Sequence, residues 1–148
     1  MSKIIEIGIT ELNNKLISNV ERIDLVEGKG IKGDRYFKEF NDIESQITLI
    51  ESENIDYYNN LFNTNFLYKD FRRNLITKDI KLNDLIDKKL SIGSSTLLVH
   101  DLCRPCKTLQ EKLGKDNIIK EFLRKGGIRC QILSSSNLNV GDKIRIKE

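Results

Sequence analysis

The densest group of chemically active side chains in the sequence is residues 100–107, His-Asp-Leu-Cys-Arg-Pro-Cys-Lys, between a strand-like and a helix-like stretch. Pro105 is typical of the first turn of a helix, where a missing N–H costs nothing. The pattern therefore places Cys106 in that turn, near the positive end of the helix dipole, with Arg104 and Lys107 on either side. These features favour thiolate over thiol, so Cys106 is predicted to be the reactive cysteine and the better metal ligand.

Several kinds of chemistry are open to this segment. A Cys-x-x-Cys pair forms a dithiol redox site in thioredoxin-like proteins, but no βαβ unit leads into this pair. A structural zinc ion would draw on His100, Cys103, Cys106 and Cys130. Against zinc, such sites usually combine two close-spaced ligand pairs, and Cys130 stands alone. The third alternative is one thiolate that ligates a cofactor metal or carries a persulfide sulfur, and the fourth is a pair of buried structural cysteines.

Two earlier segments carry cations in settings that suit a bound anion. Residues 30–36 read Gly-Ile-Lys-Gly-Asp-Arg-Tyr, and residues 71–74 read Phe-Arg-Arg-Asn. The glycines permit positive φ angles and close approach of the backbone, and Arg35 can hold an oxyanion through two N–H groups. Taken alone, each pattern is more typical of a polar turn or of a solvated surface.

The elements that must position these segments are mostly short strands, with fewer helices. Strand patterns cover residues 3–9, 20–26, 46–50, 89–92, 95–100, 128–133 and 143–147. Helix patterns cover residues 52–62, 106–113 and 116–124. This inventory predicts a mainly β fold, a closed or partly closed barrel with a few short helices.

The composition bounds the class of protein. The chain has 148 residues, one proline and no linker-like stretch, which predicts a single domain over residues 1–148. No apolar run approaches the roughly 20 residues that span a bilayer, and no signal peptide is apparent, so we expect a cytoplasmic protein. A net charge of +3 is too small to indicate nucleic-acid binding, and an odd number of cysteines, three, argues against a disulfide framework.

The order of the motifs resembles the MOSC family, which is named after the C-terminal domain of molybdenum cofactor sulfurases. The matching segments are residues 30–36, 46–51, 72–75, 92–93, 103–106, 126–129 and 140–142. No single segment is specific, but seven in this order are, and they span nearly the whole chain.

The resemblance implies a barrel-like β domain that binds molybdenum cofactor, a metal held by molybdopterin. Cys106 matches the family's invariant cysteine, which ligates molybdenum in the enzymes and was proposed to receive sulfur in the sulfurases. The residues expected to hold the pterin cofactor are Lys32, Gly33, Asp34, Arg35, Arg72, Arg73, Asn74 and Arg129. Family members often carry histidine at the position of Tyr36, which is a departure in this chain.

Two functions follow from the resemblance. Some members reduce N-hydroxylated compounds, and with three cysteines this chain lacks the four that a typical iron–sulfur cluster needs. A reductase would therefore depend on a separate electron-donor protein. The other function is a carrier or insertion chaperone, which passes cofactor or sulfur to a molybdoenzyme or receives it from a sulfurase. Neither requires nucleic acid or a membrane.

Overall fold

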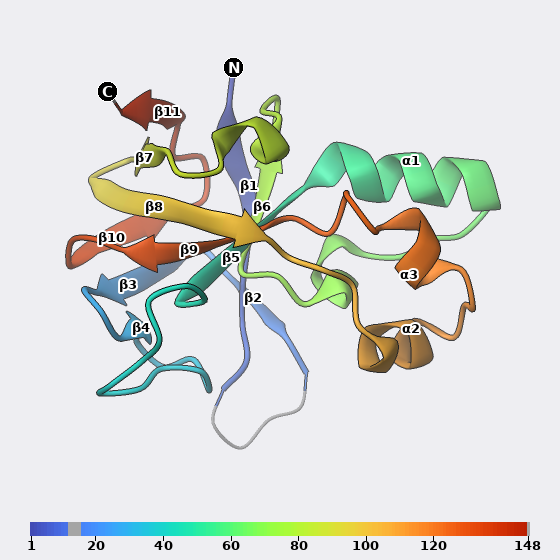
Figure 1. Cartoon of the computed structure of the whole chain (residues 1–148), viewed down its shortest axis with the longest axis horizontal. Helices are drawn as coiled ribbons and strands as arrows, with labels where there is room; N and C mark the ends of the chain where they lie inside the picture. Colours follow the sequence, from blue (N-terminus) through green and yellow to red (C-terminus); the bar gives the residue numbers. More distant parts are fainter. Residues whose placement is uncertain (12–15, 148) are drawn as a thin grey trace.

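The chain folds around one strongly curled β-sheet, shown in Figure 1 by a computed structural model that describes residues 1–11 and 16–147. The order of its eight strands is β11-β7-β8-β9-β5-β6-β1-β2, and a smaller sheet has the order β10-β3-β4. The strands of the large sheet are, in the same order, Ile144–Lys147, Lys89–Ile92, Ser95–Leu102, Ile128–Ile132, Ile47–Glu51, Leu75–Lys78, Lys3–Ile9 and Ser18–Val20. Those of the small sheet are Ser136–Asn139, Arg22–Val26 and Gly30–Ile31. The predicted mainly β class is confirmed.

The segment before β11, at one edge of the large sheet, approaches β1, the strand next to the opposite edge, which gives the sheet its half-barrel shape. Lys3 at the start of β1 forms an isolated bridge with Lys143, just before β11. The N–H of Ile4 donates to the carbonyl of Asp142 at 2.9 Å, and the N–H of Gly141 donates back to Ile4 at 2.8 Å. These bonds fix strands from opposite ends of the chain around a common interior.

The interior is filled by alternate residues of each strand, as β9 illustrates. Ile128, Cys130 and Ile132 are fully buried in the main apolar cluster, whereas Arg129 and Gln131 lie on the other face. Burial raises the pKa of the Cys130 thiol far above its ordinary value. Cys130 therefore packs in the core.

Helices α1, α2 and α3 gather beyond one end of the large sheet (Figure 1), and buried residues from these helices and from η1 form a second apolar cluster, whereas Leu82 and Leu85 of η2 belong to the main one. Helix α1 lies on the connection between the parallel neighbours β5 and β6. The ring of Tyr58 on this helix packs against Phe122, which also packs against Phe71. The helical elements are α1 (Ser52–Phe62), α2 (Lys107–Leu113), α3 (Ile118–Glu121) and the 3-10 helices η1 (Tyr68–Phe71) and η2 (Leu82–Leu85). None of the described helices has the length and apolar character needed to cross a membrane.

Two of the predicted elements were wrong, and three strands were missed. The helix predicted at residues 116–124 is reduced to the four residues of α3, because the chain turns after Phe122 to bring Gly126 against the backbone of Cys103. The strand predicted at residues 20–26 breaks at Glu21, whose carbonyl accepts the N–H of Val140, so its two halves join different sheets. Strands β4, β6 and β10 were not predicted.

Gly126 and Gly127, which precede β9, sit where the backbone leaves no room for a side chain. A Cβ on Gly126 would lie 2.6 Å from the carbonyl oxygen of Cys103, and a Cβ on Gly127 would overlap the carbonyl oxygen of Leu49. Gly127 also has a φ of 98°, in the region that favours glycine. Only glycine at these positions lets β9 enter the sheet beside β5.

Gly127→Ala should therefore lower the free energy of unfolding by roughly 3 kcal/mol or more, because it adds a steric overlap to backbone strain. Gly28→Ala is the matched control, since Gly28 also has a positive φ but has open space around it. We expect that control to cost about 1 kcal/mol. Urea denaturation of both variants measures the difference, and equal losses would contradict the close-packing argument.

Candidate functional site

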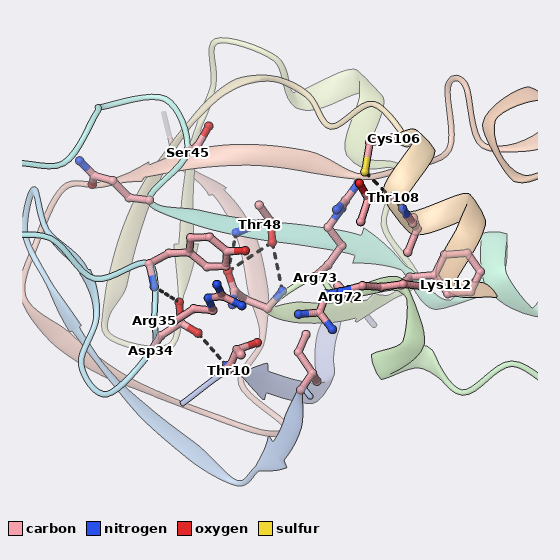
Figure 2. A pocket seen from close by; sticks show the side chains of 16 residues that line it. Thr10, Asp34, Arg35, Ser45, Thr48, Arg72, Arg73, Cys106, Thr108 and Lys112 are labelled. Atoms are coloured by element: carbon pink, nitrogen blue, oxygen red, sulfur yellow. Dashed lines mark hydrogen bonds between the residues drawn. The ribbon is translucent and has the colours of Figure 1, made fainter. Parts of the chain in front are cut away.

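A cavity of about 370 Å³ lies between the curled sheet and α2, and it collects side chains from distant segments (Figure 2). We call it the thiol pocket. It brings together six of the residues predicted from the sequence: Asp34, Arg35, Arg72, Arg73, Asn74 and Cys106. The basic segments at residues 30–36 and 71–74 thus converge on the cysteine loop.

The turn that carries Arg35 is held against the end of β1. The N–H of Thr10 donates to one carboxylate oxygen of Asp34 at 2.8 Å, and the N–H of Tyr36 donates to the other at 3.2 Å. The N–H of Arg35 donates to the carbonyl of Thr10 at 2.6 Å. Asp34 is buried, and the hydrogen bonds that its carboxylate accepts from these backbone N–H groups fix the turn. The Arg35 guanidinium lies over the Tyr36 ring, 5.3 Å from its centroid, which favours one orientation of the cation.

The second basic segment is anchored by its neighbours in the same way. Arg73 donates from Nε to the carbonyl of Gly126 at 2.9 Å, a bond that uses only part of the guanidinium. The amide oxygen of Asn74 accepts from the N–H and the hydroxyl of Thr48, at 3.1 and 3.2 Å, and its nitrogen donates to Gly8 at 3.1 Å. Asn74 therefore joins the ends of β1, β5 and β6, which positions the two arginines that precede it.

Cys106 is the N-cap of α2 and not a residue of its first turn. The helix begins at Lys107, so the predicted start at Cys106 was one residue early and Pro105 precedes the cap. The Cys106 sulfur accepts the N–H of Leu109 at 3.4 Å, and the side chain is exposed at the edge of the thiol pocket. The thiol is thus held by a helix end yet open to a ligand.

The other two cysteines are buried, and they do not join Cys106 in a metal site. Burial raises the pKa of the Cys103 thiol, and the side chain is 8% exposed. The Nε2 atom of His100 is 2.9 Å from the side-chain oxygen of Gln131. Within residues 1–11 and 16–147, no three His, Cys, Asp or Glu side chains are grouped so that they could hold a metal ion. The structural-zinc alternative, with His100, Cys103, Cys106 and Cys130 as ligands, is therefore wrong.

Three predicted residues lie outside the thiol pocket: Lys32, Gly33 and Arg129. Arg129 forms ion pairs with Glu44 at 3.0 Å and Asp101 at 3.2 Å. The hydrogen bond that Arg129 donates to Glu44 raises the pKa of Arg129. The hydrogen bond from the Leu102 N–H, together with the charge of Arg129, lowers the pKa of Asp101. Arg129 thus connects the loop before β5 to the end of β8.

Several polar residues of the pocket were not predicted from the sequence. Lys112 and Thr108 both lie on α2, four residues apart, so they share one face of the helix. A helix predicted from Cys106 onward would not have placed them beside the thiol, because residues two and six positions after Cys106 lie on the other side of such a helix. They line the same pocket because Cys106 is the N-cap and lies outside the helix. The others are Thr10, Ser45, Gln46 and Thr48. These come from strand ends and loops whose convergence depends on the sheet order.

A mainly β domain thus presents one exposed thiol and several cations in a single cavity between its curled sheet and α2. Residues 27–145 match the MOSC domain, and the chain belongs to this family. A comparison with curated proteins gave no match.

Three solved structures share the fold. The YuaD protein of Bacillus subtilis superposes with a TM-score of 0.81 at 19% identity, over 97% of this chain and 94% of that one. YiiM of Geobacillus stearothermophilus gives 0.78 at 15% identity, over 100% and 76% of the two chains. YiiM of Escherichia coli gives 0.74 at 15% identity, over 97% and 69%.

The three thiols differ in exposure, and this difference predicts selective alkylation of one of them. Native protein at neutral pH should incorporate one iodoacetamide group per molecule, on Cys106, because Cys103 and Cys130 are buried. Mass spectrometry of the intact protein measures the number of groups, and peptide mapping locates them. Cys106→Ser should remove the labelling and Cys130→Ser should leave it unchanged. Faster labelling of Cys103 than of Cys106 would contradict the site geometry.

Proposed function

We propose that this protein binds molybdenum cofactor in the thiol pocket, with Cys106 as the protein ligand of the metal. The observation that carries the proposal is the convergence of one exposed thiol with four cationic side chains. These cations are Arg35, Arg72, Arg73 and Lys112. A soft thiolate suits a metal already held by sulfur, and cations suit the phosphate and the dithiolene group of the pterin.

The residues present fit such a group. The only carboxylate that lines the pocket within the described chain is Asp34, and both its oxygens already accept backbone N–H groups. Four cations against one engaged carboxylate leave the cavity with a positive balance. Several donors are needed because a buried phosphate is costly unless it is paired and hydrogen-bonded. The volume of about 370 Å³ is also within the range of small-molecule sites.

When bound, the cofactor would supply two-electron redox chemistry at its metal. The chain's own residues would bind and orient it: Cys106 as the ligand, Arg35 and Arg73 as donors to its charged groups, and Asn74 as the support of that arginine turn. We propose reduction of N-hydroxylated compounds as the activity, with electrons from a separate protein. Three free cysteines are typical of a reducing compartment, which supports a cytoplasmic location.

A carrier role is the alternative, and the exposure of Cys106 favours it. A thiol at the surface is accessible to a protein partner, such as a sulfurase that donates sulfur or a molybdoenzyme that accepts the cofactor. Turnover of an N-hydroxylated substrate with an artificial reductant distinguishes the two roles. A reductase reconstituted with cofactor turns over under these conditions, whereas a carrier binds cofactor without turnover.

Cys106→Ser should abolish retention of molybdenum and leave the fold intact. Serine is harder to ionise and is a poor soft ligand, but its hydroxyl is a preferred N-cap, so α2 keeps its capping bond. We expect the melting temperature to change by no more than about 3 °C. The measurement pairs elemental analysis for molybdenum with thermal unfolding, after purification in the presence of cofactor.

Cys103→Ser is the matched control in the same loop, and it should retain measurable molybdenum because its side chain does not line the pocket. Equal molybdenum in wild type and in Cys106→Ser would reject the ligand assignment. Unfolding of Cys106→Ser would instead assign the cysteine a structural role.

A second prediction concerns the cations. Arg35→Gln should weaken cofactor binding about tenfold, because it removes a charged donor that lines the pocket. Lys32→Gln removes the same charge from the same turn, but Lys32 is exposed and lies outside the pocket, so binding should remain within about twofold. Equal effects of the two substitutions on the dissociation constant would indicate that only the overall charge matters.

A further inference from the structure

A second hollow, of about 850 Å³, adjoins the thiol pocket and has no role in the function proposed above. We call it the side groove. It shares three lining residues with the thiol pocket: Ile17, Arg72 and Lys112. Figure 2 shows Arg72 and Lys112 together at the side of the pocket away from Arg35. A molecule in the groove would therefore have one end beside the thiol pocket.

One wall of the groove is apolar and well fixed. Phe66 lies on it and is held by Asn59, whose side-chain oxygen accepts the N–H of Phe66 at 2.9 Å and whose nitrogen donates to its carbonyl at 2.9 Å. The Phe66 ring also packs edge-on against Phe71, with 5.9 Å between the centroids. Leu16, which is 71% exposed, and Leu113 extend this wall. A rigid aromatic side chain with aliphatic neighbours suits a flat apolar ligand.

The other lining side chains give the groove a positive charge. Lys69, Arg72 and Lys112 are its cations, and Asp70 is the one acid among its described residues. The carboxylate of Asp70 accepts the N–H of Leu67 at 2.8 Å, so it is already engaged. Neither lysine forms an ion pair with a described residue. Cations beside an apolar wall complement a ligand that has an aromatic body and an anionic group.

We propose that the side groove binds the aromatic part of an anionic substrate, with the ring against Phe66 and Leu113 and the anionic group, a phosphate or a carboxylate, between Lys69 and Lys112. As a statement about the substrate of the thiol pocket, this rests on the proposed function. As a statement about binding, it stands on the groove alone. It predicts that substrates are aromatic or heteroaromatic anions and not neutral molecules.

The test uses cofactor-free full-length protein and three probes, measured by calorimetry: 1-naphthyl phosphate, inorganic phosphate and 1-naphthol. The naphthyl phosphate should bind at least about tenfold more tightly than either fragment, because only it uses both the apolar wall and the cations. Lys69→Glu should weaken its binding about tenfold or more, since Lys69 lines the side groove but not the thiol pocket. Lys89→Glu, a charge reversal of an exposed lysine on β7, is the matched control and should have no effect.

A second variant tests the aromatic wall. Phe66→Leu keeps an apolar side chain but removes the ring, and it should weaken the naphthyl probe several-fold without changing the affinity for phosphate. Thermal unfolding of each variant confirms that it is folded. Loss of phosphate binding together with naphthyl binding would show a general disturbance and overturn the assignment of Phe66.

The remaining outcomes separate the two proposals. Naphthyl phosphate that binds Lys69→Glu as tightly as wild type overturns the side groove, and so does binding that depends on Arg35 and not on Lys69. If naphthyl phosphate binding depends on Lys69 but the wild-type protein retains no molybdenum after purification with cofactor, the side groove is supported and the proposed function is rejected. If the wild-type protein retains molybdenum but naphthyl phosphate binding does not depend on Lys69, the proposed function is supported and the side groove is rejected. Binding should persist in Cys106→Ser, because the thiol is not part of the groove.

Discussion

The close contact at Gly126 and Gly127 is the constraint on which the site depends. The carbonyl of Gly126 accepts the Nε–H of Arg73, and the carbonyl of Gly127 accepts the N–H of Cys103 at 2.7 Å. The same two residues let β9 lie directly against β5, because neither has a side chain to separate the backbones. One dipeptide thus fixes the arginine turn, the cysteine loop and the central strand pair relative to one another. A pocket made of loops is otherwise prone to local opening, since loops have few apolar contacts of their own.

The shape of the thiol pocket depends on polar side chains that hydrogen-bond to the backbone of its loops, as well as on the cations that line it. The side chains of Asp34 and Asn74 form hydrogen bonds with backbone groups of the protein, and Arg129 forms ion pairs with Glu44 and Asp101. These residues looked like ligand contacts in the sequence because polar side chains near glycine and arginine suit both purposes. In the structure Asp34 and Asn74 hold the loops that carry Arg35, Arg72 and Arg73, which preorganises these cations. Such preorganisation avoids ordering side chains at the moment of binding.

The sequence predicted the class of fold and most strands, because alternating buried residues in stretches such as Ile128–Ile132 are a direct record of a one-sided core. It also predicted which segments meet, through the resemblance to a family. The sequence could not show that Arg73 lines the thiol pocket and Arg129 does not, since this depends on the order of the strands in the sheet. It placed Cys106 one residue too far into the helix, because an N-cap differs from the first turn only in backbone angles. The short strand β6 lacked enough residues to show a period, and its burial comes from its neighbours.

Charge connects the thiol pocket to the side groove. Arg72 and Lys112 line both, so an anion in either space would interact with some of the same cations. An anionic group bound at the thiol would reduce the positive potential felt in the groove, and the groove ligand would act back on the pocket by the same free energy, because linkage between two sites is reciprocal. Lys69 and Arg35 each belong to one space only, and they keep part of the attraction independent. If both proposals hold, an anion in each space would have one cation of its own, Arg35 in the thiol pocket and Lys69 in the side groove, and the two anions would share Arg72 and Lys112.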